Sequence, residues 1–252
     1  MKEGNFEEEI IFGVHPVLEA LKNGADIDKL LIQKGIAPEH FKPLNAAAHD
    51  AQIPYQLVPK EKLNRLTRAN HQGVIAFISA ISFFDWEQVV DETLKKGKVP
   101  LLLYLDGVTD VRNFGAIARS AYCFGVDAIL IPARGSARIG GDAMKTSAGA
   151  LMHQKVCRVF KPLDMFDTLL LRGFNLIACT EKAKSFSFEA NFTQPTVILM
   201  GSEDEGLSHE ITAKCQHHVK IPMVNQSIGS LNVSVATGAM LYEVNRQRLI
   251  KP

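Results

Sequence analysis

Three polar clusters in the second half of the chain carry side chains that could bind or activate a substrate. Asn113 and Arg119 belong to the first cluster, Glu203 to the second, and Ser230 with Asn232 to the third. They provide a guanidinium, a carboxylate, two amides and a hydroxyl, groups that can bind phosphates and sugars or stabilise a developing charge. Each cluster follows an apolar segment. If those segments are strands of one sheet, the clusters indicate a single site.

The residue types alone leave other interpretations open. An isolated asparagine or serine such as Asn113 or Ser230 more often caps a helix than takes part in catalysis. Arg119 follows small apolar residues, and it could pair with a carboxylate in a structural role. The glycines Gly201 and Gly206 could serve only to make turns. No G-x-G-x-x-G sequence follows an early strand, so the dinucleotide site of an oxidoreductase is not supported.

Cysteine and histidine spacing gives no sign of a metal site. The eight histidines include no H-E-x-x-H sequence, and the adjacent His217 and His218 would point to opposite faces of a strand. The cysteines form no C-x-x-C pair, which predicts reduced and mostly buried thiols. They are Cys123, Cys157, Cys179 and Cys215. We therefore expect no metal ion.

Short apolar segments alternate with helical patterns from residue 99 onward. This alternation predicts an α/β fold with a mostly parallel sheet covered on both faces. The expected strands cover residues 101–105, 128–131, 156–160, 176–179, 197–200 and 218–221. The expected helices cover residues 115–124, 163–171 and 231–249, with shorter ones from Asp142 and after Ser208. Ligands of such folds bind beyond the carboxyl ends of the strands, where the polar clusters lie.

The first 79 residues predict a separate small α/β domain. Its first helix opens around Phe12-Gly13-Val14-His15-Pro16 and ends near Asn23. Further elements are expected at residues 29–33, 41–50, 55–58 and 73–78. The periodicity then changes, and we interpret residues 80–98 as a linker that includes a helix capped by Asp85. Residues 99–252 form the second domain.

Charge and hydropathy narrow the class of protein. The apolar stretches are too short to cross a bilayer, and the acidic start of the chain has no apolar signal core. We therefore expect a cytoplasmic protein without a membrane partner. The net charge is +1, yet residues 112–161 hold eight basic and two acidic residues. Such a run is most often a solvated face, but an excess of this size is also typical of a phosphate-binding surface.

Together the three clusters resemble the signature motifs of the SpoU/TrmH superfamily of RNA 2'-O-ribose methyltransferases, over about residues 99–245. The matches of the first motif are Asn113, Gly115 and Arg119. Those of the second are Gly201, Glu203, Gly206 and Leu207, and those of the third are Pro222, Ser230, Leu231, Asn232, Val233, Ser234 and Ala236. The chain departs from the family at Val111 and Arg112, where relatives often carry Pro and His or Ile, and residues 224–229 are about one residue longer than usual.

The resemblance implies a fold and an activity. The second domain is expected to contain a deep trefoil knot, which general rules of chain connection disfavour. The first domain, with its Phe12-Gly13-x-His15-Pro16-Val17 opening, resembles the L30e-like RNA-binding domain of the ribosomal-RNA guanosine methyltransferases. The expected reaction is therefore S-adenosylmethionine-dependent 2'-O-methylation of a guanosine in 23S ribosomal RNA.

Two alternatives from the same superfamily are weighed against this reaction. A tRNA ribose 2'-O-methyltransferase is disfavoured by the large first domain. A catalytically silent RNA-binding relative would lack Asn113 or Arg119, and both are present. No DNA partner is expected.

The resemblance also implies roles for individual residues. The expected catalytic residues are Asn113, Arg119, Glu203, Ser230 and Asn232. The expected cofactor-binding residues are Leu199, Gly201, Gly206, Ile221, Pro222, Leu231 and Asn232. The family proposal of Arg119 as a base conflicts with the stability of a protonated guanidinium, so we favour Arg119 as a phosphate ligand that stabilises the developing charge.

Family members also pair through helices near the knot, so a homodimer is expected, in which Arg119 can act beside the cofactor of the partner. The final helix carries an apolar set large enough to cover both its own sheet and a neighbouring chain, although core packing alone could also explain it: Val235, Ala236, Ala239, Met240 and Val244.

Overall fold

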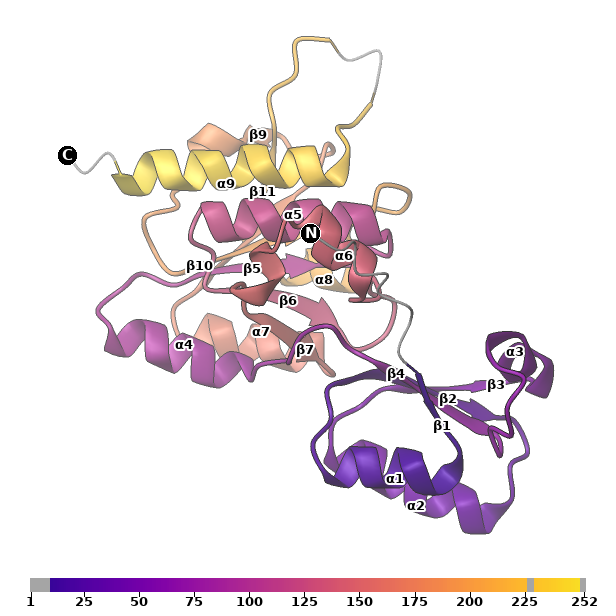
Figure 1. Ribbon diagram of the computed structural model, residues 1–252. Helices are drawn as coiled ribbons and strands as arrows, with labels where there is room; N and C mark the ends of the chain where they lie inside the picture. Colours follow the sequence, from indigo (N-terminus) through magenta and orange to yellow (C-terminus); the bar gives the residue numbers. More distant parts are fainter. Residues whose placement is uncertain (1–9, 226–228, 250–252) are drawn as a thin grey trace. The chain divides into compact units, whose positions relative to one another are not determined.

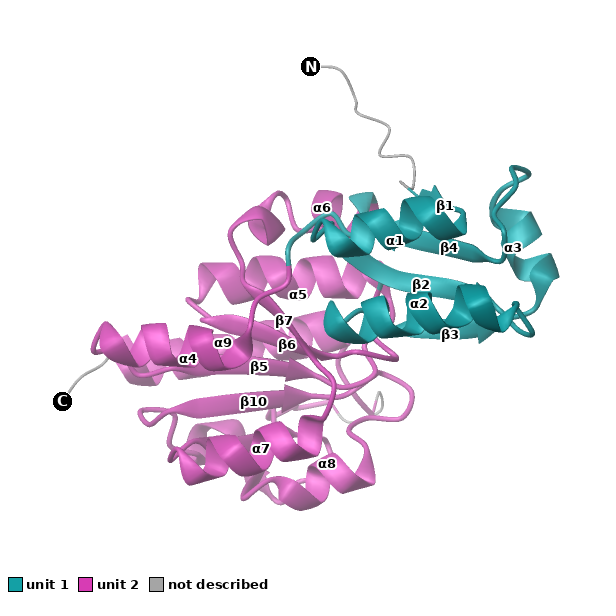
Figure 2. Cartoon of the chain, turned by 90° about the horizontal axis from the view of Figure 1, so that it is seen from below, with its two compact units in different colours: residues 1–82, 138–141 teal, residues 83–137, 142–252 magenta. Residues whose placement is uncertain are grey.

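The computed structural model describes residues 10–225 and 229–249, and it divides into two compact units (Figure 2). Unit 1 comprises residues 1–82 and 138–141, and unit 2 comprises residues 83–137 and 142–252. Each unit has its own sheet and its own hydrophobic core.

Unit 1 is built on a four-stranded sheet with the strand order β1-β4-β2-β3. Its elements are β1 (Ile10–Phe12), α1 (Val14–Lys22), β2 (Ile27–Gln33), α2 (Pro38–Asp50), β3 (Tyr55–Val58), α3 (Lys60–Leu66) and β4 (Val74–Ile78). Strands β2 and β3 are parallel, and the other pairs are antiparallel. Alternation along β2 sorts its side chains between two cores. Leu30 and Ile32 pack with α1 and α2, whereas Leu31 packs with Leu63 of α3.

The start of α1 explains the Phe12-Gly13 opening of the first domain. Gly13 has φ +91°, a value that residues with a Cβ rarely adopt. The first helical N–H, of Val14, donates to Oε1 of Gln72 at 3.0 Å. The neighbouring His71 is buried, and its ring accepts from the N–H of Gly73 at 3.0 Å. These contacts fix the end of β1 against the turn before β4.

Unit 2 contains a seven-stranded sheet in which every neighbouring pair is parallel. The strand order is β7-β6-β5-β10-β8-β11-β9. The strands are β5 (Leu101–Leu105), β6 (Ala128–Pro132), β7 (Val156–Val159), β8 (Asn175–Cys179), β9 (Ser185–Phe186), β10 (Thr196–Met200) and β11 (His217–Lys220). The α/β class and the mostly parallel sheet predicted from the sequence are confirmed.

Helices cover both faces of this sheet (Figure 1). They are α4 (Trp86–Lys95), α5 (Val111–Cys123), α6 (Gly141–Thr146), α7 (Pro162–Leu171), α8 (His209–Lys214) and α9 (Val233–Leu249), with the short 3-10 helices η1 (Ala150–Met152) and η2 (Ser187–Glu189). Helices α5 and α9 pack together on one face, and α4 and α7 lie on the other. The core on the second face includes Val90 of α4, Phe166 of α7 and Leu199 of β10.

Three differences from the sequence predictions affect the site or the division into domains. Helix α5 begins at Val111 instead of residue 115, because the carboxylate of Asp110 accepts the N–H of Asn113 at 2.7 Å and so caps the helix earlier. Residues 80–98 do not act only as a linker, since Val89 and Val90 of α4 are buried in the core of unit 2. Residues 138–141 belong to unit 1, where the carbonyl of Ile139 accepts the N–H of Ala80 at 3.1 Å.

The apolar set of the final helix is divided between two environments. Met240 and Val244 are fully buried in their own chain, so they are core residues and do not serve an interface. Val235 and Tyr242 are exposed at 56% and 62%. The buried positions cover the sheet of their own chain, as the sequence analysis allowed for part of the set, and the role of the exposed positions in an interface stays a prediction.

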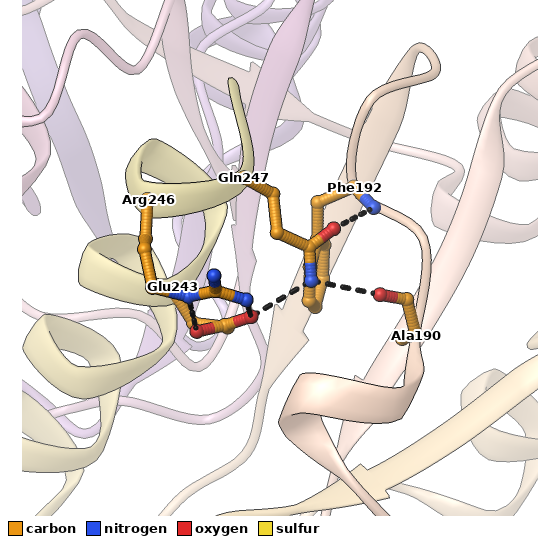
Figure 3. Close-up of polar contacts among 5 residues, drawn as sticks. All are labelled: Ala190, Phe192, Glu243, Arg246 and Gln247. Atoms are coloured by element: carbon orange, nitrogen blue, oxygen red, sulfur yellow. Dashed lines mark hydrogen bonds and ion pairs between the residues drawn. The ribbon is translucent and has the colours of Figure 1, made fainter. Parts of the chain in front are cut away.

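The carboxyl-terminal part of α9 is fixed to the segment before β10 (Figure 3). The side chain of Gln247 donates to the carbonyl of Ala190 and accepts from the N–H of Phe192, both at 3.0 Å. Two turns of the same helix are joined by the pair of Arg246 and Glu243 at 2.8 Å. Arg248 donates to four backbone carbonyls, including that of Val99 at 2.8 Å.

The trefoil knot remains a prediction from the family resemblance. No described helix is long and apolar enough to span a membrane.

Candidate active site

Side chains of all three sequence motifs meet in one hydrogen-bonded cluster, the Asn–Glu–Asn cluster, formed by Asn113, Glu203 and Asn232. The amide of Asn113 donates to Oε1 of Glu203 at 3.0 Å. The amide of Asn232 donates to Oδ1 of Asn113 at 3.0 Å, and also to Oε1 of Glu203. The three residues are separated by up to 119 positions in the sequence, so the fold of unit 2 brings them together.

The cluster also joins the amino termini of two helices, α5, whose first turn contains Asn113, and α9. Oε1 of Glu203 accepts the N–H of Val233 at 3.1 Å, which places a carboxylate at the positive end of α9. Oδ1 of Asn232 accepts the N–H and the hydroxyl of Ser234 at 3.0 and 2.6 Å. Asn232 therefore caps α9, the role that the sequence interpretation left open for Ser230. Asn113 caps no helix, because Asp110 caps α5.

A pocket of about 960 Å³ lies at the carboxyl ends of β8, β10 and β11. This edge includes the switch point between β5 and β10, from which the chain builds the sheet in both directions. The predicted site residues that line the pocket are Gly201, Glu203, Gly206, Ile221, Pro222, Ser230 and Leu231. Its volume is that of a site for a small molecule or cofactor. Residues 226–228, part of the segment that is longer than usual in the family, lie outside the described residues.

Gly201 leaves room for nothing larger than hydrogen. A Cβ at this position would lie 2.1 Å from the backbone carbon of Gly206 and 2.2 Å from the nitrogen of Leu207. The loop from Gly201 to Gly206 is closed by the N–H of Gly206, which donates to the carbonyl of Ser202 at 3.0 Å. The backbone of this loop therefore turns back on itself at the pocket wall, and the polar backbone groups there can approach a ligand closely.

Four predicted site residues do not line the pocket. Leu199 is fully buried in the core with α4 and α7, and its neighbour Met200 faces the pocket instead because side chains alternate along a strand. If Leu199 contacts the cofactor, it therefore does so through its backbone, and its role stays a prediction. Asn113 and Asn232 act in the cluster. Arg119 is exposed on α5, about 9 Å along the helix axis from Asn113, and it has no hydrogen-bond partner among the described residues.

Several pocket residues were not among the site residues expected from the sequence. Thr180, Glu181 and Lys182 follow β8, Phe186 belongs to β9, and Lys220 ends β11. The sequence gives only a weak signal for these residues. The segment after the expected strand 176–179 also lies at the carboxyl edge of the sheet, but the sequence does not show that this strand neighbours β10. Cys179 also lines the pocket. Burial raises the pKa of its thiol to about 12, which makes Cys179 a neutral thiol and no nucleophile at neutral pH.

The role of Asn232 as a cap can be tested by its effect on stability. We expect Asn232→Ala to lower the free energy of unfolding by about 1 to 2 kcal/mol, because the first N–H groups of α9 lose their acceptor. Asn232→Ser retains a capping oxygen but loses the side-chain amide that donates to Asn113 and Glu203. It should therefore recover most of the stability while leaving the cluster broken. Denaturant unfolding of both variants measures the difference, and equal losses in the two variants would show that the cap contributes little.

The comparisons with known proteins give the class of this protein. A family model described as the SpoU rRNA Methylase family matches residues 100–242, and one described as RNA 2'-O ribose methyltransferase substrate binding matches residues 10–84. A Staphylococcus aureus (strain MSSA476) protein assigned to the TrmH family of tRNA/rRNA methyltransferases is 38% identical over 245 residues, which cover 96% of this chain and 97% of the relative.

Solved structures agree with this class. The SpoU methyltransferase AviRb from Streptomyces viridochromogenes, in complex with the cofactor AdoMet, aligns with a TM-score of 0.60 at 25% identity, covering 97% of this chain and 92% of the other. The TrmH/SpoU tRNA modifying enzyme of A. aeolicus aligns with a TM-score of 0.55 at 32% identity, covering 64% and 85%. The chain belongs to the SpoU rRNA methylase family. It is an S-adenosylmethionine-dependent RNA methyltransferase, as the motifs predicted.

The pocket suits this cofactor. Met200, Leu207 and Ile221 line the pocket with apolar side chains, and the crowded turn at Gly201 presents backbone groups without intervening side chains. These features are typical of nucleoside sites, which combine apolar walls with a few polar backbone contacts.

Proposed function

We propose that the protein methylates the 2'-oxygen of a guanosine ribose in 23S ribosomal RNA. The observation that carries this proposal is the Asn–Glu–Asn cluster, which joins three separate motifs beside a cofactor-sized pocket. Asn113 and Arg119 are both present, which argues against a catalytically silent relative.

The presence of unit 1 is the ground on which we favour ribosomal RNA over tRNA. The tRNA-modifying neighbour from A. aeolicus covers 64% of this chain, so about a third of the chain has no counterpart in it. AviRb covers 97%, and the substrate-binding family model matches residues 10–84. We infer that unit 1 binds ribosomal RNA and that unit 2 carries out the reaction.

In this proposal the protein positions the ribose and stabilises charge. The sulfonium of the bound cofactor supplies an already activated methyl group, so no covalent protein intermediate is needed. The cluster holds the loop of Gly201 and the amino terminus of α9 in one arrangement, and Asn113 orients the target nucleotide from the same cluster. Arg119 binds the neighbouring phosphate and stabilises negative charge on the 2'-oxygen. Ser230 shapes the pocket.

Exposed cations on unit 2 provide a surface for the RNA backbone. Arg112, Arg119, Arg134 and Lys145 are all exposed and belong to the basic run identified in the sequence. Contacts of such residues with phosphates release counterions. The affinity for RNA should therefore fall steeply with salt concentration.

The proposed function is tested by incubating the full chain with labelled S-adenosylmethionine and undermodified 23S ribosomal RNA or tRNA. The modified ribose is then mapped by resistance to alkaline hydrolysis. Methylation of one guanosine in ribosomal RNA supports the proposal. Modification of tRNA alone would replace the substrate class, and methylation of a base would overturn the assignment to the 2'-oxygen.

We also propose a homodimer, in which Arg119 acts beside the cofactor of the partner. Large side chains remain exposed on the face formed by α5, η1 and α9, and we name these four the interface patch: Tyr122, Met152, Val235 and Tyr242. Contiguous exposed apolar surface marks association sites, and a twofold interface buries the same patch in both chains. Arg119 lies on α5, outside the pocket of its own chain. This position suits an action at the pocket of the partner chain.

The dimer predicts a change in mass after one substitution in the interface patch. Tyr242→Glu should shift the protein from dimer to monomer at micromolar concentration, because a charge buried in a twofold interface lies against the same apolar surface in its partner. Leu171→Glu is the matched control, since Leu171 is 90% exposed at the end of α7 on the opposite face of the sheet. Light scattering measures both masses. A wild-type monomer would refute the dimer.

Action in trans predicts complementation between two inactive variants. Arg119→Ala protein is mixed with a variant that cannot bind the cofactor, such as Gly201→Val. Random exchange of subunits makes about half of the dimers mixed, and each mixed dimer regains one of its two sites. The mixture should therefore recover about a quarter of the wild-type activity. A stable mixed dimer without activity would show that Arg119 acts within its own chain.

A further inference from the structure

A pair of phenylalanine rings next to the pocket has no role in the proposed reaction as described above. Phe186 of β9 and Phe188 of η2 are stacked, with ring centroids 5.3 Å apart and an interplanar angle of 16°. We name this pair the aromatic platform. We propose that the aromatic platform binds an unpaired nucleobase of the RNA substrate close to the target ribose. This inference rests on the proposed function and adds a second RNA contact to it.

Exposure separates the two rings. Phe186 lines the pocket, whereas Phe188 lies outside the lining and is 53% exposed. An aromatic ring in contact with water is unfavourable unless another surface covers it, and unpaired bases in RNA complexes commonly stack on such rings. A base on Phe188 would extend the existing stack outward from the pocket.

The charges around the platform suit a polyanion. Nζ of Lys220 lies 5.2 Å from the centroid of the Phe186 ring. Lys182 and Lys184 are exposed on the segment that leads into β9. Two carboxylates are nearby in the sequence, Glu181 and Glu189, but Glu189 accepts the N–H of Phe186 at 2.7 Å and is engaged in the turn. Three cations next to stacked aromatic rings are typical of surfaces that bind single-stranded nucleic acid.

The platform is held in place before any ligand binds. Strand β9 pairs with β11 through the register of Phe186 with Lys220. The segment that follows is fixed by Gln247, whose side chain bonds Ala190 and Phe192 (Figure 3). A preorganised surface loses little conformational entropy when a base stacks on it, which favours a binding role.

Binding by the full chain tests the proposal. Phe188→Leu retains an apolar side chain but removes the ring, and it should weaken binding of an undermodified 23S ribosomal RNA fragment about tenfold to a hundredfold. The affinity for S-adenosylmethionine, measured by calorimetry, should stay unchanged. Phe188→Trp should restore RNA binding. Phe160→Leu is the matched control, because Phe160 is similarly exposed but follows β7, at the opposite edge of the sheet from β9.

A second readout reports stacking directly. The chain contains a single tryptophan, so the additional fluorescence of the Phe188→Trp variant can be assigned to position 188, and RNA should quench it. The proposal is overturned if Phe188→Leu keeps its RNA affinity within twofold, if its cofactor affinity falls as much as its RNA affinity, or if RNA leaves the new fluorescence unchanged. If the wild type methylates no RNA, the proposed function itself fails. If the wild type is active and Phe188→Leu behaves like it, only the platform fails.

Discussion

Arg119→Ala is expected to lower kcat for RNA methylation by about a hundredfold to a thousandfold, the effect of removing one hydrogen-bond donor from a developing oxyanion. The affinity for S-adenosylmethionine should not change, because Arg119 does not line the pocket. Stability should also be retained, since the side chain is exposed. Single-turnover methylation and calorimetry measure these quantities separately.

Two further variants distinguish charge from geometry at position 119. Arg119→Lys keeps the positive charge but loses the planar fork that binds two oxygens, so it should recover only part of the rate. Arg112→Ala, on the same helix and also exposed, should weaken RNA binding with little effect on kcat. A loss of cofactor affinity in Arg119→Ala, or a normal rate, would contradict the proposed role of this arginine.

The order of elements in unit 2 was predictable because each strand is a short apolar run between helical patterns. The central strands of the parallel sheet have water on neither face and are almost entirely apolar, as in the fully buried β5 and β10. The two-residue strand β9 carries too little pattern to be predicted. The start of α5 was missed because the capping residue Asp110 precedes several polar residues that resemble a loop.

The candidate site was predictable only in part. Motif resemblance indicated Asn113, Glu203 and Asn232, but not that they bond one another, because their distances in the chain exceed any local periodicity. Phe186 and Lys220 reach the pocket because the strands follow the spatial order β10-β8-β11-β9. This order differs from the order of the strands in the sequence. The sequence could not show that the side chain of Leu199 points into the core, because the register of a strand with two apolar faces cannot be read from its composition.

The turn at Gly201 should be the position most sensitive to an added side chain. Gly201→Val is expected to weaken S-adenosylmethionine binding more than a hundredfold. Even the Cβ of alanine would lie 2.1 Å from backbone atoms of Gly206, and backbone cannot move aside as the end of a flexible side chain can. The loop from Gly201 to Gly206 must open, which displaces Glu203 and with it the hydrogen bond to the amino terminus of α9.

The matched control for this substitution is Gly140→Ala. A Cβ at Gly140 would have no atom of the described residues within 4 Å, and the φ of Gly140 is not positive, so the variant should bind cofactor as the wild type does. Calorimetric titration with S-adenosylmethionine measures the affinities, and circular dichroism confirms that both variants are folded. Gly201→Ala should lie between the two, because it introduces the same clash with a smaller group. If a folded Gly201→Val protein binds cofactor normally, the pocket beside β10 is not the cofactor site.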